Sequence, residues 1–214
     1  MPINNILTAG GIVSYPLLVF SLLAVALIIE RTIFWVRIKR KQRRVVKEAL
    51  SLYRSDSFSA VAKLKKNAQL PIARIFLEAL ELEEPTADEF RLALDSATQA
   101  EIPTLRRFAT LFQTIVAASP LLGLLGTILG LMESFSSMDI GNATGSNSAG
   151  VMEGLSVALV STVMGLVVAI FTLLFANTFR GLYLQELALI QEYGGQLELL
   201  YRRFHLGARK YAPH

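Results

Sequence analysis

Charged residues are distributed unevenly along this chain and divide it into alternating apolar and polar stretches. Three stretches contain no Asp, Glu, Lys or Arg, namely residues 10–29, 108–132 and 154–179. Each provides about 20 or more residues, which is what an α-helix needs to cross roughly 30 Å of hydrocarbon. The pattern therefore predicts an all-α membrane protein. Its three transmembrane helices are expected at residues 10–36, 108–135 and 151–179.

The polar segment 37–107 also carries the start signals of helices. Ser57 is expected to cap a short helix, and Pro71 suits the first turn of another helix that ends at Leu82. The motif Thr86-Ala-Asp-Glu89 then has the spacing of a capping box, in which each side chain bonds the other residue's backbone. The segment is therefore expected to be helical throughout, as a long extension of the membrane helices.

Two further helices are predicted to be long. Beyond Thr86 only Pro103 interrupts the helical pattern, so we expect one helix from about residue 87 to 135. In the tail, residues 180–214, apolar residues recur at helical spacing, which indicates an amphipathic helix with a weak point at Gly194-Gly195. The apolar stripe of this tail fits packing within the protein or between subunits, and less well a docking site for another protein.

The placement of basic residues predicts the orientation in the membrane. Residues 1–30 and 132–179 contain neither Lys nor Arg, whereas fifteen of the 21 basic residues lie in 37–107 and five in 180–214. Cytoplasmic segments carry the excess of Lys and Arg, so the last two segments are expected in the cytoplasm. The expected outer, periplasmic segments are the N-terminus, residues 1–9, and a short loop, residues 136–150.

Composition argues against several classes of function. The chain has no cysteine, so disulfides and thiolate chemistry are excluded, and His205 and His214 have no companion residues that predict a metal site. No phosphate-binding loop or nucleophile elbow is present, so we expect neither an enzyme nor a cofactor. The basic cluster at residues 37–47 adjoins a membrane span and lacks interleaved aromatics, which favours a topology anchor over nucleic-acid binding.

Small residues form a face on each of the last two membrane helices. Such a face permits close helix packing, and it also suits a narrow polar passage. Thr127 and Thr162 also have two interpretations. The hydroxyl of a threonine in a membrane helix can bond the backbone of its own helix, or it can take part in a proton or water path. The candidate pathway residues are Thr127, Thr162, Gly123, Gly130, Ser134, Ala158, Gly165 and Ala169.

Few charged residues lie near the membrane helices. Glu30 is expected to pair with Arg31, or with a neighbouring subunit, at the cytoplasmic side. Glu133 and Glu153 flank the outer loop, where they are either exposed residues at a pore mouth or a ring that attracts cations. No acid lies in the middle of any span, so a proton channel would need a carboxylate from another polypeptide.

The membrane segments resemble those of a known family. The run Ser119-Pro-Leu-Leu-Gly-Leu-Leu-Gly-Thr127, followed by Gly130, is similar to the second-span signature of the MotA/TolQ/ExbB proton-channel family. Pro16-Leu-Leu with Ile28-Ile-Glu-Arg31 resembles its first span, and the run from Val157 to Ala169 resembles its third. Three spans and a modest length favour the ExbB/TolQ branch over the four-span flagellar stators.

This resemblance implies a homo-oligomeric ring, a pentamer, in the bacterial inner membrane. The ring would enclose a single-span partner like ExbD or TolR, whose membrane aspartate supplies the missing carboxylate. Proton flow would drive a TonB-like protein for outer-membrane uptake. A TolQ-like motor subunit for envelope maintenance and a non-conducting membrane scaffold are the alternatives.

The resemblance also assigns individual residues. By position, Thr127 and Thr162 match the lumen-lining threonines of the family. One departure is Val157, which stands where many members carry a glutamate in the third span. Glu153 lies about one turn earlier on the same face, close to the outer surface. We therefore expect this chain to depend on the acid of its partner.

Overall fold

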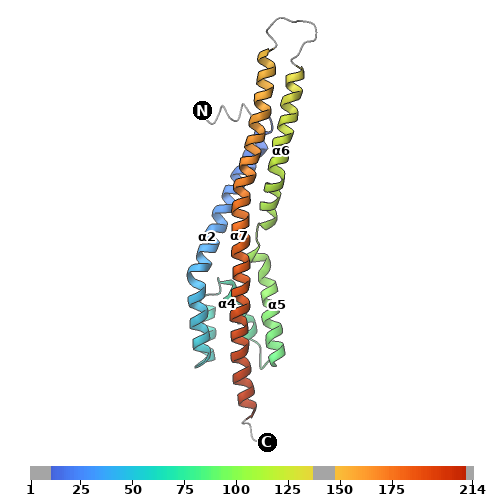
Figure 1. The fold of residues 1–214 in the computed structure, drawn as a ribbon. Coiled ribbons are helices and arrows are strands. Elements are labelled where there is room, and N and C mark those ends of the chain that lie inside the picture. The colour runs from blue at the N-terminus through green and yellow to red at the C-terminus, as the bar shows by residue number, and fades with distance from the viewer. Residues whose placement is uncertain (1–10, 137–147, 211–214) are drawn as a thin grey trace. The chain divides into compact units, whose positions relative to one another are not determined.

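The computed structural model describes residues 11–136 and 148–210, with the side chains of 148–149 and 205–210 left aside, and consists there of helices joined by short turns. The expected outer N-terminus, residues 1–9, and most of the expected loop 136–150 fall outside this description. The all-α prediction is confirmed for the described residues. Figure 1 shows the helices α2 (Ser14–Tyr53), α3 (Ser57–Lys65), α4 (Pro71–Leu80), α5 (Ala87–Leu105), α6 (Ala109–Ser136) and α7 (Ser148–Lys210).

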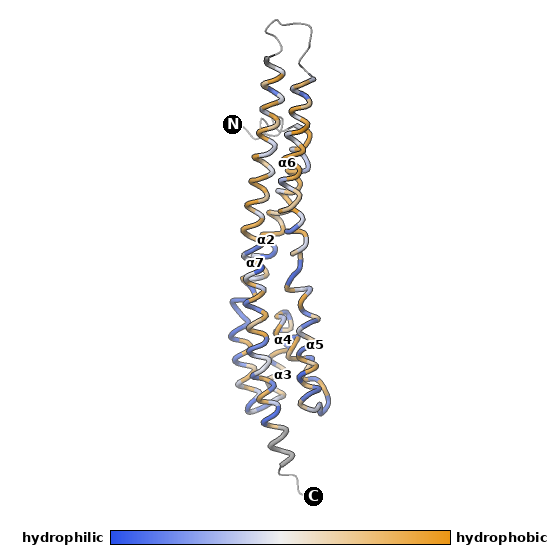
Figure 2. Tube along the Cα trace, turned by 45° about the vertical axis from the view of Figure 1, so that its right-hand side comes forward, coloured by the Kyte–Doolittle hydropathy of each residue, from blue (hydrophilic) through white to orange (hydrophobic). Residues whose placement is uncertain are grey.

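Three helical stretches are long and apolar enough to cross a membrane, as the sequence predicts. They lie within Ser14–Tyr53, Ala87–Ser136 and Gly150–Phe204. The chain divides into two compact units, one of residues 1–31 and 108–179 and one of residues 32–107 and 180–214. We call the first the apolar unit and the second the charged unit, because only five of the 38 charged side chains belong to the first. Figure 2 colours the chain by hydropathy, from hydrophilic in blue to hydrophobic in orange.

The apolar unit is built from the first part of α2, from α6 and from the first part of α7. Ala24, Leu27 and Ile28 of α2 form a buried cluster with Phe112 and Ile115 of α6, and aromatic residues of α7 pack against this cluster. The rings of Phe112 and Phe179 lie 5.7 Å apart between centroids. These contacts place all three helices together at the end of the unit that is nearer in sequence to the basic residues.

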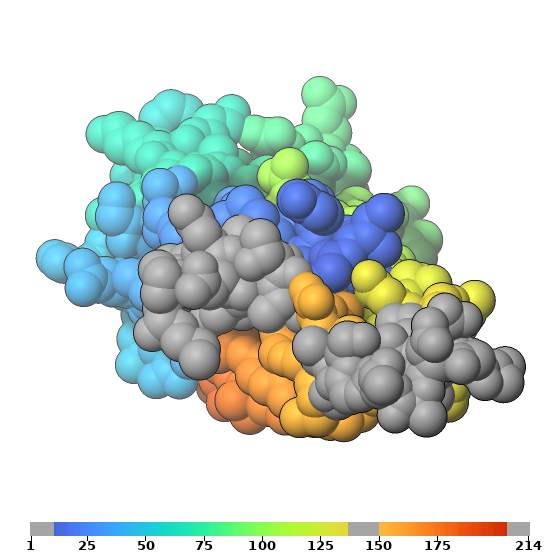
Figure 3. All heavy atoms as spheres, turned by 90° about the horizontal axis from the view of Figure 1, so that it is seen from above, coloured from blue at the N-terminus to red at the C-terminus, as the bar shows by residue number. Residues whose placement is uncertain are grey.

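The start of α2 also contacts the remaining two helices, at residues part-way along each of them, since Val13 lies against Gly126 of α6 and Gly11 against Val157 of α7. Figure 3 views the unit from above, with the start of α2 in dark blue, α6 in yellow and α7 in orange. Ser14, which is completely buried, places its hydroxyl 3.9 Å from the sulfur of Met164 on α7. The start of α2 therefore packs against the middle of the α6–α7 pair. The outward sides of the three helices are rich in exposed Leu, Ile and Val.

The predicted single helix from 87 to 135 is wrong, because it is interrupted between α5 and α6. α5 ends at Leu105, and α6 begins at Ala109. Phe108 adopts a φ of 67°, in the left-handed region, and therefore cannot continue an α-helix. No glycine or asparagine marks this position, so the pattern of the sequence gives no sign of the break. The break coincides with the boundary between the two units.

The charged unit combines α3, α4 and α5 with the remainders of α2 and α7. α4 is its most buried element, with Ile72, Ile75 and Phe76 almost fully inaccessible. Arg74 of α4 donates two hydrogen bonds of 2.5 and 2.6 Å to the carboxylate of Glu101 on α5. These contacts make α4 the centre of the unit. The tail predicted to be amphipathic is the second part of α7, which continues through Gly194-Gly195 without interruption.

The helix ends of the charged unit test the predicted caps. The capping box is confirmed, since the Thr86 amide donates to Glu89 Oε2 at 2.7 Å and the Glu89 amide donates to Thr86 Oγ1. Pro71 occupies the first turn of α4, as predicted, although this helix ends at Leu80 rather than Leu82. The predicted cap of α3 is displaced by one residue. Asp56, not Ser57, accepts the free amides, because its carboxylate reaches two of them.

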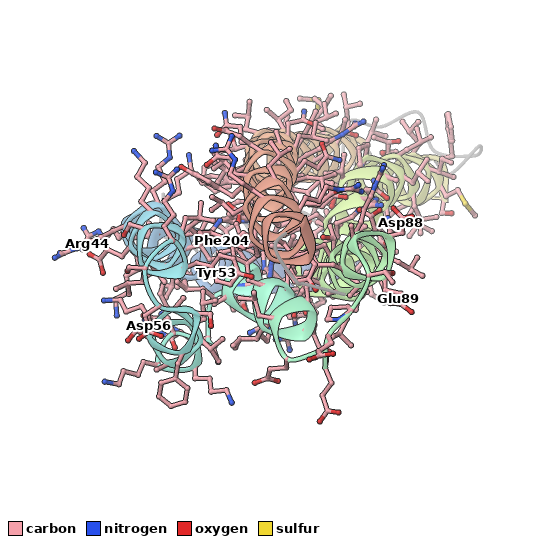
Figure 4. All side chains as sticks on the ribbon, turned by 90° about the horizontal axis from the view of Figure 1, so that it is seen from below. Arg44, Tyr53, Asp56, Asp88, Glu89 and Phe204 are labelled. Carbon is pink, nitrogen blue, oxygen red and sulfur yellow. The ribbon has the colours of Figure 1, made fainter. Side chains whose placement is uncertain are left out.

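Figure 4 shows how the lower ends of these helices are joined. The ring of Tyr53, at the end of α2, meets that of Phe204 on α7 edge to face, with 6.2 Å between centroids. Asp88, in the first turn of α5, accepts a hydrogen bond of 3.3 Å from Arg202 of α7. Tyr201 stacks on Phe90 of α5 at 4.2 Å between centroids. The second part of α7 thus binds α2 and α5 into one bundle.

Candidate functional site

The contact between α6 and α7 contains most of the predicted pathway residues. Residue numbers rise along α6 as they fall along α7 in this contact, so the two helices are antiparallel. A Cβ atom on Gly130 would lie 2.6 Å from the carbonyl oxygen of Gly154, and one on Gly165 would lie 2.5 Å from that of Ser119. Side chains do not fit at such distances, so these glycines allow the two backbones to touch.

The remaining small residues of the two faces complete this contact. Ser134 is buried and donates to the carbonyl oxygen of Gly130 on its own helix, and its hydroxyl also lies 3.2 Å from that of Val151 on α7. Ala158 is buried against Gly130. Ala169, farther along α7, is also buried within the apolar unit. Close packing, one of the two interpretations of the small faces, therefore accounts for these residues within one chain.

One carbonyl group in the contact is approached by two hydroxyls. The carbonyl oxygen of Gly123 on α6 lies 3.3 Å from Ser161 Oγ and 3.3 Å from Thr162 Oγ1, both on α7. Ser161 is completely buried and lies 2.9 Å from the carbonyl oxygen of Ala158, to which it can donate instead. Each hydroxyl has a single proton to donate. Thr162 can donate to Gly123 while Ser161 donates to Ala158, or Ser161 can donate to Gly123 itself, and neither choice requires the backbone to move.

The two predicted threonines lie differently. Thr162 bonds across the contact to Gly123, whereas Thr127 donates to the carbonyl oxygen of Leu124 on its own helix at 2.6 Å. Both side chains are half-buried, unlike the fully buried Ser161. A hydroxyl that donates one hydrogen bond keeps acceptor capacity, so each threonine can still bind a water or a donor from a neighbouring helix.

Glu30 and Arg31 form the ion pair that the sequence predicts. Arg31 Nε donates to Glu30 Oε2 at 2.9 Å, and the arginine is only 2% exposed. Its guanidinium carbon also lies 5.7 Å from the centroid of the Phe108 ring. The aromatic residue at the α5–α6 break therefore covers a buried cation. Sequence reasoning missed Phe108, for which the only signal is its place directly after two arginines and before an apolar run.

Glu133 and Glu153 are both exposed, near the end of α6 and the start of α7. Neither has an ion-pair partner among residues 11–136 and 150–204, whose side chains the structure describes. Within the same part of the chain, no group of three or more His, Cys, Asp or Glu is placed to hold a metal. Their position at a pore mouth and their role in a ring that attracts cations both stay predictions.

A buried carboxylate in the charged unit was not predicted. Glu186 of α7 is 4% exposed and accepts a short hydrogen bond from Gln42 Nε2 of α2. Burial raises the pKa of the Glu186 carboxyl, and the Gln42 hydrogen bond and the charge of Lys39 oppose this rise. Gln42 lies within the basic run of α2, so the sequence suggests an exposed residue there, although it is 2% exposed.

Comparison with known proteins identifies relatives of this chain by sequence. A protein of Synechocystis sp. named ExbB-like 3 is 70% identical over 197 residues, which are 92% of this chain and 94% of that protein. ExbB-like 1 of Synechocystis sp. is 36% identical over 206 residues, 96% of this chain and 79% of that protein. The Tol-Pal system protein TolQ of Haemophilus influenzae is 31% identical over 122 residues, 57% of this chain and 51% of TolQ.

The sequence pattern described as the MotA/TolQ/ExbB proton channel family matches residues 67–192, more than half of the chain. This match includes α6, the α6–α7 contact and most of α7. Three helices that could cross a membrane and relatives along nearly the whole length make this a multi-pass membrane protein of a channel and transport type. The chain belongs to the MotA/TolQ/ExbB proton channel family.

Proposed function

We propose that this chain is the ExbB-like proton-channel subunit of a complex in the bacterial inner membrane. In this proposal an ExbD-like partner supplies a membrane aspartate, and proton flow drives a TonB-like protein for outer-membrane uptake. Several copies of the chain, a pentamer, surround the helices of the partner. The N-terminus is periplasmic and the C-terminus cytoplasmic, because the basic residues lie in the charged unit.

One observation supports this proposal most directly. The apolar stretches of α6 and α7 place hydroxyls at a shared carbonyl but contain no carboxylate. Hydroxyls can pass a proton along hydrogen bonds, but they do not hold its charge at neutral pH. A charge moved through the membrane field is worth about 2.3 kcal/mol per 100 mV, and coupling to that energy needs a group that titrates. That group must come from another polypeptide.

The proposal gives separate roles to the predicted pathway residues. Thr127 and Thr162 offer acceptor oxygens to the partner helix or to water, since both are half-exposed in the single chain. Gly123, Gly130, Ser134, Ala158, Gly165 and Ala169 hold the helices at the spacing that the pathway requires. Glu133 and Glu153 stand at its outer mouth, and Glu30 with Arg31 at its inner end.

The test is proton flux through the complex of this chain with its single-span partner, reconstituted in liposomes with an imposed membrane potential. The double variant Thr127→Val, Thr162→Val removes both hydroxyls and keeps the side-chain shape. We expect at least a tenfold loss of flux. The matched control is Thr114→Val with Thr178→Val, because these exposed threonines also lie on α6 and α7 and bond only their own helices. Undiminished flux in the Thr127→Val, Thr162→Val variant would mean that neither hydroxyl belongs to the proton pathway.

Two alternatives have some support. The similarity to TolQ favours a motor subunit for envelope maintenance, and the partner that co-purifies with the chain from its own cells decides between the two roles. The close α6–α7 contact favours a scaffold that does not conduct. A complex that assembles with the partner but shows no flux in liposomes would support the scaffold and contradict the channel.

A further inference from the structure

The first part of the charged unit bears an open cavity along one side of α2. Its volume is about 400 Å³, and it is lined by Thr32, Ile33, Val36, Arg37, Arg40 and Lys41. These positions recur at helical steps of three and four, so they share one face of the helix. None of the side chains that the structure describes covers this face. Ile33 is 54% exposed and Val36 is 45% exposed.

The cavity joins two kinds of side chain. Ile33 and Val36 form its apolar end, and the three exposed cations Arg37, Arg40 and Lys41 form the other. None of these cations has an ion-pair partner among the side chains that the structure describes. Unpaired cations beside exposed aliphatic groups are complementary to a ligand that has an anionic end and a hydrocarbon end.

The next turn of α2 is different. Arg44 forms an ion pair of 2.9 Å with Glu48, which also pairs with Lys63 of α3. Figure 4 shows Arg44 pointing away from the bundle, so this side of α2 faces outward there as well. Arg44 is therefore neutralised within the protein, whereas Arg37, Arg40 and Lys41 lie unpaired beside Ile33 and Val36 among the side chains that the structure describes.

The position of the cavity identifies its ligand. The apolar run of α2 ends at Val36 and the basic run begins at Arg37, so a membrane-spanning α2 places this cavity at the level of the lipid headgroups. Arginine binds phosphate through paired N–H groups, and the stems of such side chains extend along apolar surface. A soluble polyanion would neutralise the cations but leave Ile33 and Val36 in water.

We propose that this cavity binds an anionic phospholipid of the cytoplasmic leaflet. Arg37, Arg40 and Lys41 hold the phosphate-bearing headgroup, and Ile33 and Val36 contact its acyl chains. The inference depends on α2 crossing the membrane and is independent of proton conduction. Each basic side chain near an anionic membrane contributes about fivefold in affinity, so loss of three should weaken binding by about 100-fold.

The experiment measures lipid bound to the purified full chain in detergent, by native mass spectrometry, during titration with phosphatidylglycerol or phosphatidylcholine. We expect the chain to prefer phosphatidylglycerol and the triple variant Arg37→Gln, Arg40→Gln, Lys41→Gln to lose that preference. The control triple variant is Arg43→Gln, Lys47→Gln, Arg54→Gln. It removes the same charge from exposed residues outside the cavity, and should bind as the original chain does.

A second variant and a soluble probe make the test specific. Ile33→Ser with Val36→Ser keeps every charge, and we expect it to weaken phosphatidylglycerol binding as well. Glycerol phosphate, which has the charge without acyl chains, should not compete at equal concentration. Equal loss in both triple variants, equal binding of the two lipids, unchanged binding in the serine variant, or competition by glycerol phosphate would each overturn the proposal. The four remaining basic residues of the 37–47 cluster preserve the orientation of the triple variant.

Discussion

Gly130 and Gly181 are both glycines within long helices, but their surroundings predict opposite effects of an added methyl group. A Cβ on Gly130 would meet the backbone of Gly154 and Ala158 at 2.6–2.8 Å, whereas one on Gly181 has nothing within 4 Å. We expect Gly130→Ala to destabilise the protein by about 1–3 kcal/mol, as overpacking does. Gly181→Ala should stabilise it by about 0.5–1 kcal/mol, because alanine favours a helix.

Thermal unfolding in detergent, followed by circular dichroism, measures both changes. The two substitutions are chemically identical, so each serves as the control for the other. If Gly130→Ala were as stable as Gly181→Ala, the backbones of α6 and α7 would not be in contact, and the small faces would be free to line a passage.

At residue scale the buried acid of the charged unit should make stability depend on pH. Burial raises the pKa of the Glu186 carboxyl above its ordinary value of 4.5. The folded state then binds more protons than the unfolded state between these two values, so stability falls as pH rises through that window. We expect Glu186→Gln to be more stable than the original chain at pH 8, because the neutral amide still accepts the Gln42 hydrogen bond.

The advantage of Glu186→Gln should shrink as the pH falls towards 4.5, where the acid is protonated in the folded protein. Chemical unfolding at pH 8 and pH 5 measures it. Glu192→Gln on the same helix is the control, since Glu192 is exposed and its variant should differ little at either pH. An advantage that is constant between the two pH values would mean that Glu186 does not titrate in this range.

At the scale of elements, local sequence signals predicted helix starts better than helix breaks. The capping box at Thr86 and the first-turn proline at Pro71 act through neighbouring backbone groups, so a few adjacent residues suffice to recognise them. The break at Phe108 has another origin. It brings an aromatic ring over Arg31, which lies 77 positions earlier in the sequence, and no local pattern encodes such a contact.

The break at Phe108 predicts which of two variants at this position is more stable. A continuous helix would predict the opposite order. At a φ of 67°, a glycine avoids the cost of about 1 kcal/mol that any L side chain incurs there. Phe108→Gly and Phe108→Ala both lose the ring over Arg31, so their difference isolates the backbone. We expect the glycine variant to be more stable by about 1 kcal/mol in thermal unfolding. A continuous helix from 87 to 135 would give the reverse order, because alanine favours a helix over glycine by a similar amount.

The small-residue faces of α6 and α7 could be predicted from the sequence, but the choice between helix packing and a polar passage could not. A spacing of three and four residues is enough to place Gly123, Gly130 and Ser134 together. Packing and a passage both need small side chains, so composition alone does not separate them. The evidence for packing comes from the register of the two helices, which places a carbonyl group of one helix against a glycine of the other. Register depends on both helices at once.

At the scale of the whole molecule, charge is the property that the sequence predicted most completely. Nearly all charged residues fall in the charged unit, and the three apolar stretches coincide with helices that could span a membrane. The membrane alone imposes this division, because placing a charged side chain in hydrocarbon is costly in any fold. The assembly follows from no such rule. It depends on surfaces of other chains, and so it enters here as a proposal.

The last prediction concerns this division of labour between polypeptides. Because the apolar stretches contain no acid, we expect the purified chain alone in liposomes to show no proton flux above that of empty liposomes under an imposed potential. Addition of a single-span partner with a membrane aspartate should produce flux, and the same partner with asparagine at that position should not. A pH-sensitive dye inside the liposomes measures all three. Flux through the chain alone would mean that its own hydroxyls and water suffice, and that the two hydroxyls near the Gly123 carbonyl form a complete path.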